Sequence, residues 1–178
     1  EENLSYKDFI ASVLELDRLN DVYLYIINKV LDINKNLNES ISIQLPTLFI
    51  EDLNNYSILK ELFTKYKNEK NQNIIFEIEE DSFNKNLKNT FMYVNLFKEF
   101  NFGFAIFNFI ANSDDYIYLK ELKPKYIKAS KYFLLESKQS LSVLKILTQS
   151  LDIKLIATSV NEVSEINALA QMGINAIC

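Results

Sequence analysis

A stripe of apolar residues between Leu19 and Leu31 recurs every three or four positions and is the clearest periodic pattern in the chain. Such spacing predicts an amphipathic helix. Between stretches of this kind stand short runs rich in Ile, Leu, Val and Phe, which predict strands. The predicted helices cover residues 9–16, 19–31, 53–66, 87–97, 116–122, 141–151 and 166–172, and the predicted strands cover 41–45, 74–78, 104–110, 126–129, 154–160 and 174–178.

Strand and helix alternate from residue 41 onward, and each connection is long enough for a right-handed crossover between parallel strands. This order predicts an α/β fold with a parallel sheet. A length of 178 residues favours one domain over 1–178. An open doubly wound sheet and part of a (β/α)-barrel are both compatible with six strands.

The composition excludes several kinds of site. The chain has no histidine, which rules out histidine acid–base catalysis and the usual zinc sites. The two glycines, Gly103 and Gly173, are too far apart to form a phosphate-binding loop, so P-loop and Rossmann sites are excluded. A net charge of -5 argues against DNA or RNA as a partner. Any catalysis would use carboxylates, Lys, Tyr or a carboxylate-held metal.

The sequence also indicates a compartment. A lone cysteine, Cys178, cannot form an internal disulfide, which fits a reducing environment. No apolar run approaches the roughly 20 residues that a membrane span needs, and the first residues do not resemble a signal peptide. We therefore expect a cytoplasmic protein without membrane contact by this segment. An anionic ligand would need a local basic spot, and the densest basic stretch contains Lys120, Lys123, Lys125 and Lys128.

Functional groups in parallel α/β folds gather at the carboxyl ends of the strands. Glu77 stands in an apolar strand, so it is either a buried carboxylate with a partner or metal, or a residue turned to solvent by strand alternation. Lys128 is likewise either a site cation or a lysine that extends to solvent. The polar candidates selected by this rule are Gln44, Glu77 with Glu79 and Glu80, Asn108, Lys128, Thr158 and Cys178.

Several of these candidates also have a purely structural interpretation. We expect Asn108 to be a core amide satisfied by the backbone. Asp114 and Asp115 precede a short helix and are expected to cap it. The acidic run from Glu79 to Asp81 is expected to be a solvated loop, and the thiol of Cys178 is expected to be buried and inert.

Taken in order, these segments resemble the EAL family of bacterial cyclic di-GMP phosphodiesterases. Residues 42–46 (S-I-Q-L-P) are similar to the family's V-N-L-S strand, and residues 76–80 (F-E-I-E-E) are similar to its E-L-T-E strand. Residues 103–108 followed by 116–119 resemble the G-x-x-x-A-x-D-D-F-G strand and the helix after it. The order of these matches along the chain carries the resemblance, since each motif is altered.

The second half of the chain continues the resemblance. Residues 124–128 (P-K-Y-I-K) are similar to P-D-x-I-K-I-D, residues 155–161 resemble V-I-A-E-G-V-E, and residues 173–178 resemble G-x-D-x-x-Q-G. The family fold implied is an EAL-type (β/α)-barrel, a modified TIM barrel. This barrel is expected to be incomplete here, because the E-A-L strand would precede Glu1 and the C-terminal segment would follow Cys178.

The departures from the family motifs bear on catalysis. Members of the family bind two divalent cations through carboxylates and an Asn, and Mg²⁺ is coordinated by about six oxygen ligands. Glu77 matches the E-L-T-E glutamate and is the only residual ligand expected, and Lys128 matches the K-I-D lysine. The altered positions are Gln44 for Asn, Asn108 and Phe109 for the D-D pair, Ser130 for the Asp of K-I-D, Thr158 and Asn161 for two Glu, and Cys178 for Gln.

Three functions follow from these comparisons. The first is a catalytically inactive signalling domain without a cofactor, which binds a protein partner or cyclic di-GMP. The second is an active phosphodiesterase that depends on Mg or Mn, and the third is an unrelated α/β-barrel enzyme. The family pairs through the region after the D-D-F-G strand, which is altered and shortened over 111–115, so a homodimer stays an open expectation.

Overall fold

The computed structural model describes residues 6–34, 39–67, 69–111, 116–136, 138–174 and 176–178. Within them, the chain forms one five-stranded parallel sheet in which each strand pairs with the next along the sequence. The strands are β1 (Ile41–Leu45), β2 (Ile74–Glu79), β3 (Gly103–Phe109), β4 (Tyr126–Ser130) and β5 (Lys154–Thr158). A parallel bridge between Ala157 and Ile177 continues the same order with the last predicted strand. The predicted α/β fold with a parallel sheet is confirmed, and sequential pairing is the order of a barrel rather than of a doubly wound sheet.

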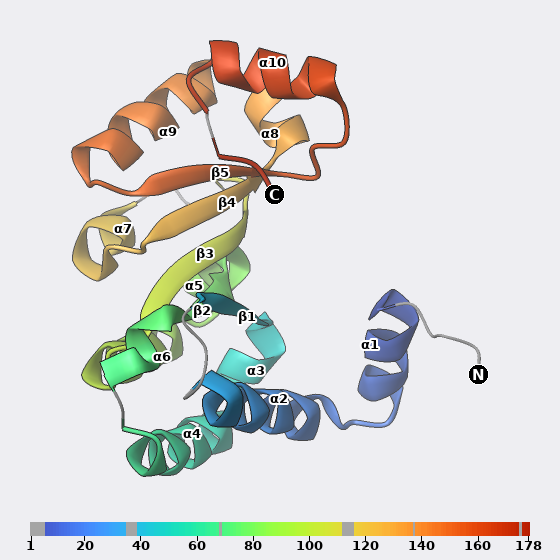
Figure 1. Cartoon of the computed structure of the whole chain (residues 1–178), viewed down its shortest axis with the longest axis vertical. Coiled ribbons are helices and arrows are strands. Elements are labelled where there is room, and N and C mark those ends of the chain that lie inside the picture. The colour runs from blue at the N-terminus through green and yellow to red at the C-terminus, as the bar shows by residue number, and fades with distance from the viewer. Residues whose placement is uncertain (1–5, 35–38, 68, 112–115, 137, 175) are drawn as a thin grey trace.

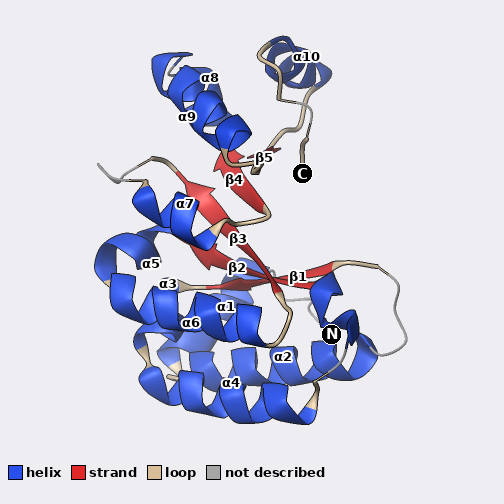
Figure 2. Cartoon of the chain, turned by 90° about the vertical axis from the view of Figure 1, so that its left-hand side faces the viewer, coloured by secondary structure: helices blue, strands red, loops and turns tan. Residues whose placement is uncertain are grey.

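The helices lie along the outer side of this curved sheet, as Figure 1 and Figure 2 show from two directions. Helices α8, α9 and α10 cover one end of the sheet, and α2, α3, α4 and α6 lie at the other (Figure 1). Their bounds are α1 (Tyr6–Glu15), α2 (Leu19–Asn34), α3 (Thr47–Glu51), α4 (Leu53–Lys65), η1 (Glu69–Asn73), α5 (Glu80–Lys85), α6 (Leu87–Glu99), α7 (Ile117–Leu122), α8 (Lys131–Glu136), α9 (Lys138–Ser150) and α10 (Val163–Gln171).

A cluster of phenylalanine rings fills the space between the sheet and its outer helices. The rings of Phe76 and Phe97 stack with centroids 4.3 Å apart, and those of Phe63 and Phe102 lie 4.5 Å apart. All four side chains are buried. Rings of this size each remove a large apolar area from water, so this cluster is a main source of stability for the β2 end of the sheet.

Alternation along the strands divides polar from apolar side chains. In β1 and β4 the residues Ile43, Leu45, Ile127 and Ala129 are buried, and the polar residues between them occupy the opposite face of the sheet. In β2 the residues on both faces are buried. Glu77 pairs in register with Gln44 of β1, so it lies on the polar face of the sheet.

The end of β3 departs from regular geometry. Its pairing with β4 shifts in register between Ile106 and Phe109, and Asn108 between them has a φ of 51°. A bulge of this kind re-aims a side chain at the edge of a sheet. The strand predicted over 154–160 ends earlier, at Thr158, where Ser159 takes a φ of 62°. Across the described parts of the chain, none of the helices is long and apolar enough to cross a membrane.

Candidate functional site

The side chain of Glu77 is the centre of the candidate site. It is 0% exposed, and its two oxygens are held by donors from two other strands. Gln44, which faces it in register on β1, donates from Nε2 to Oε2 at 3.1 Å. Lys128 places its Nζ 2.7 Å from Oε1, and the hydroxyl of Tyr126 donates to the same oxygen at 2.6 Å. Of the two interpretations that the sequence left open for Glu77, the structure has the buried carboxylate with partners, and not a side chain turned to solvent.

The surroundings of Glu77 fix its charge. Burial alone would raise the pKa of its carboxyl, but hydrogen bonds from Lys128, Tyr126 and Gln44, together with the positive charge of Lys128, outweigh burial and hold the pKa below its usual range. Burial, followed by the neighbouring Glu77, raises the pKa of Tyr126 well above its usual range. At neutral pH Glu77 is therefore a carboxylate and Tyr126 a protonated phenol.

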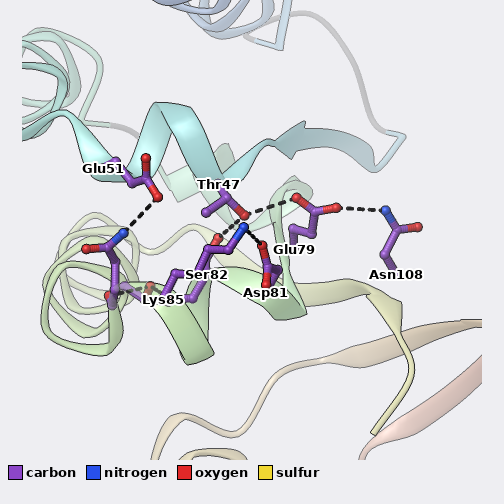
Figure 3. A network of polar contacts seen from close by, with 9 residues as sticks. Thr47, Glu51, Glu79, Asp81, Ser82, Lys85 and Asn108 are labelled. Atoms are coloured by element: carbon purple, nitrogen blue, oxygen red, sulfur yellow. Dashed lines mark hydrogen bonds and ion pairs between the residues drawn. The ribbon is translucent and has the colours of Figure 1, made fainter. Parts of the chain in front are cut away.

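A second cluster surrounds Glu79 at the carboxyl end of β2 (Figure 3). Its Oε2 accepts a hydrogen bond from the Thr47 hydroxyl at 3.0 Å, and its Oε1 accepts one from Nδ2 of Asn108 at 3.0 Å. Thr47 also lies 3.0 Å from the hydroxyl of Ser82. Asn108 is exposed, so the expectation of a core amide bonded to backbone is wrong. The register shift in β3 turns its side chain outward toward Glu79.

The acidic run after β2 forms helix α5 rather than a solvated loop. Glu80 is 2% exposed; it accepts a hydrogen bond from the backbone N–H of Ile110 at 2.8 Å and one from the hydroxyl of Tyr118 at 3.5 Å. Asp81 pairs with Lys85 one turn along α5, at 2.6 Å. A pocket of about 410 Å³ opens beside these groups at the carboxyl ends of β2, β3 and β4, and it is lined by Glu79, Glu80, Asp81, Asn84, Asn108, Phe109, Ile110 and Ser130.

The remaining sequence candidates have local structural contacts. The Thr158 hydroxyl donates to the backbone oxygen of Ala129 at 3.4 Å. The backbone N–H of Asn161 donates to Glu165 at 3.0 Å, and Glu165 pairs with the buried Lys131 at 2.5 Å. Cys178 bonds to β5 through its backbone, and its thiol is exposed. The expectation of a buried thiol is therefore wrong.

The structure thus brings together only some of the candidate residues. Gln44, Glu77 and Lys128 meet at one centre, whereas Asn108 belongs to the separate cluster around Glu79. Tyr126 was missed, although its position two residues before Lys128 on the same strand face would have indicated it. Asp114 and Asp115 lie outside the described residues. Within the described residues, no group of three or more His, Cys, Asp or Glu side chains is arranged to hold a metal ion.

Comparison with known proteins adds a family match. The model of the EAL domain family matches residues 1–178. No match was found among curated protein sequences. Among solved structures, the Vibrio cholerae LapD S helix-GGDEF-EAL protein in its apo form has a TM-score of 0.85 at 19% identity, covering 99% of this chain and 46% of that one.

Two further structures extend the comparison. The Xanthomonas citri FimX EAL domain in complex with c-diGMP has a TM-score of 0.77 at 13% identity, covering 99% of this chain and 74% of that one. The Klebsiella pneumoniae BlrP1 manganese/cy-diGMP complex has a TM-score of 0.74 at 16% identity, covering 97% of this chain and 46% of that one. The chain therefore spans less than half the length of two of these proteins, and the likeness shows a shared fold, that of part of an EAL (β/α)-barrel.

Proposed function

The chain belongs to the EAL domain family, and from that premise we propose that it is a catalytically inactive member that acts in signalling by binding a partner. Membership of this family removes the unrelated barrel enzyme that the sequence left open. Family membership alone does not separate a phosphodiesterase from a binding domain, because one fold supports both kinds of function. The proposal therefore depends on the chemistry around Glu77.

The replaced residues around Glu77 carry the proposal, because Gln44, Ser130 and Thr158 stand where the family pattern has an Asn, an Asp and a Glu. The family resemblance implies two divalent cations, and such ions need several oxygen ligands each. Glu77 has both of its oxygens engaged by donors, and an ammonium group stands 2.7 Å from one of them. A metal at Oε1 would have to displace Lys128 or Tyr126, and a metal at Oε2 would meet the amide of Gln44, which offers one neutral oxygen at most. The residues around Glu77 do not fit a two-metal centre, and we derive no hydrolytic step through one.

The ion pairs of the lysines near this site also indicate which class of partner the domain binds. Cyclic di-GMP carries two phosphates, and phosphate recognition relies on cationic side chains or well-placed donors. The charge of Lys128 is already balanced by Glu77, and that of Lys131 by Glu165. Among the described residues, the adjoining pocket has three acidic residues and no cationic residue in its lining. We therefore favour a protein partner, with cyclic di-GMP as the second candidate because the FimX and BlrP1 structures contain it. We also place the domain in the cytoplasm, since its lone cysteine fits a reducing compartment.

Calorimetric titration of cyclic di-GMP, with and without Mg²⁺ or Mn²⁺, tests the proposal. Heat from hydrolysis, confirmed by a linear product, would overturn catalytic inactivity. Saturable binding without turnover would support a cyclic di-GMP receptor, and Lys128→Ala should then weaken binding while the exposed Lys60→Ala, on α4, should not. Absence of both binding and turnover would leave the domain as a protein-interaction module.

A further inference from the structure

Lysines at the two edges of the sheet differ in how their charge is balanced. Near the carboxyl edge, Lys85, Lys128 and Lys131 each lie within 2.5–2.7 Å of a carboxylate oxygen. Near the amino edge, none of the described lysines at the starts of β3, β4 and β5 forms an ion pair. The described lysines at this amino edge therefore differ from those three in having no carboxylate partner.

Four lysines make up this surface, which we name the basic edge: Lys98, Lys123, Lys125 and Lys154. Helices α6 and α7 run antiparallel to the strands and end at this edge, where they place Lys98 in the last turn of α6 and Lys123 at the C-cap of α7. Lys125 immediately precedes β4 and Lys154 begins β5. The backbone N–H of Lys154 donates to the backbone oxygen of Lys125 at 3.3 Å, so the two are direct neighbours. All four side chains are exposed.

Lys125 is held in position by its surroundings. Its Nζ donates to the backbone oxygen of Gln72 at 3.1 Å. Its aliphatic stem lies against Gly103, where an added Cβ would meet Cε and Cδ of Lys125 at 3.1 and 3.2 Å. An open pocket of about 670 Å³ lies beside it, lined by Gln72, Lys98, Asn101, Phe102, Gly103 and Lys125. Because these contacts already order the side chain of Lys125, binding of an anion to it costs less conformational entropy than binding to a freely moving lysine.

The charges at this edge repel one another. Partial burial, and then the positive charge of Lys123, lowers the pKa of Lys98. Of the described acidic residues in the adjoining segments, Glu99, Glu121 and Asp152 form no ion pair with the basic edge. Cations at helix C-termini are favourable, which accounts for Lys98 and Lys123. That argument does not extend to Lys125 and Lys154, which stand at the starts of strands.

We propose that the basic edge binds an acidic segment of a protein partner. This inference rests on the proposed function, that the domain acts by binding, and it names the class of partner. A carboxylate-rich segment would supply negative charge to lysines that have no carboxylate partner among the described residues, and Lys125 and Lys154 are direct neighbours that one segment can contact together. A long nucleic acid is disfavoured because it would extend past the edge over the rest of a chain whose net charge is -5, whereas a short acidic segment can remain on the edge.

A peptide of eight glutamates, titrated into the protein at low ionic strength, is the direct test. We expect saturable binding that weakens as salt is added, because exposed charges are screened. The double variant Lys98→Glu/Lys125→Glu should raise Kd at least tenfold. The matched control Lys60→Glu/Lys88→Glu changes the net charge equally at exposed lysines away from the basic edge, and it should change Kd less than twofold. Circular dichroism of both variants verifies that they remain folded.

Several results would overturn this inference: no saturable binding by the wild-type protein, equal weakening in both double variants, or stronger competition by a DNA duplex than by the peptide. The edge variant should leave the cyclic di-GMP titration unchanged, because Glu77 and Lys128 lie on another part of the sheet. Failure of the basic edge is therefore distinguishable from failure of the proposed function.

Discussion

The ammonium group of Lys128 lies 2.7 Å from Oε1 of Glu77, although β2 and β4 are separated by β3. The residue that faces Glu77 in register on the intervening strand is Ala105, which is fully buried. A methyl group there leaves room for the longer side chains from both sides to meet above it. A small residue at the centre of the sheet therefore permits contacts between strands that are not neighbours.

Removal of Lys128 should cost more stability than neutralisation of Glu77. The variant Lys128→Met leaves a buried carboxylate without its cation, and we expect a loss of about 3 kcal/mol. The variant Glu77→Gln leaves an ammonium group that is 15% exposed and can extend toward water, so its loss should be smaller. Urea denaturation of both variants at neutral pH measures the two free energies of unfolding.

The pair of Lys85 with Asp81 provides the matched control, because both side chains are largely exposed. The variant Lys85→Met should leave the denaturation midpoint almost unchanged, since exposed pairs contribute little. An effect of Lys128→Met no larger than that of Lys85→Met would mean that the buried pair is not a significant source of stability.

The stabilisation from Glu77 should disappear in acid. The pKa of its carboxyl is lowered in the folded protein from an ordinary value of 4.5. The ionised group therefore contributes stability above about pH 4.5, and this contribution is lost as the pH falls through the lower folded value. The difference in unfolding free energy between the wild type and Glu77→Gln should narrow below about pH 4.5. A difference that stays constant down to about pH 3 would contradict the lowered pKa.

A larger side chain at Ala105 should separate Glu77 from Lys128. The variant Ala105→Leu adds three carbons over a buried position, and overpacking of this kind costs about 1–3 kcal/mol. Because the added carbons occupy the space between the partners, a later Lys128→Met change should cost less in this background than in the wild type. A double-mutant cycle measures this coupling. Additive effects would show that Ala105 does not govern the contact.

The parallel α/β sheet and the longer helices could be predicted from the sequence because they extend over enough residues to show a period. Helices α3, α5 and α8 were missed, since each has five or six residues and begins within one residue of a strand's end. The rule that polar strand ends converge selected both Glu77 and Lys128 as candidates, but the sequence did not indicate that they pair with each other. The acidic run over 79–81 was misjudged because Glu80 is bound by Ile110, which follows β3, and by Tyr118 of α7, and these residues lie 30 and 38 positions away in sequence.

The orientation of Asn108 could not be predicted from the alternation of β3. A regular strand would have buried it among apolar neighbours, but the register shift gives it a positive φ and an exposed side chain. A glycine often marks such a bulge, and here an asparagine fills that position. The local sequence therefore carried no signal that distinguished a bulge from a regular strand.

That conformation gives a prediction about the residue types that position 108 tolerates. Glycine adopts a φ of 51° without strain, whereas a β-branched residue does so at a cost. Both Asn108→Gly and Asn108→Val lose the hydrogen bond to Glu79. The difference in stability between the two variants therefore measures the cost of the positive φ for a β-branched residue. We expect the valine variant to be less stable than the glycine variant by about 1–2 kcal/mol, measured by urea denaturation.

Asn84 supplies the control, because it is an exposed asparagine within helix α5. Glycine is a poorer helix former than valine, so the order of the two substitutions should reverse there, with Asn84→Gly less stable than Asn84→Val. Equal stability of the valine and glycine variants at position 108 would mean that β3 can straighten, and Asn108 would then turn away from Glu79. The reversal between the two sites would instead establish that the bulge fixes the cluster of Thr47, Glu79 and Asn108 at the carboxyl edge of the sheet.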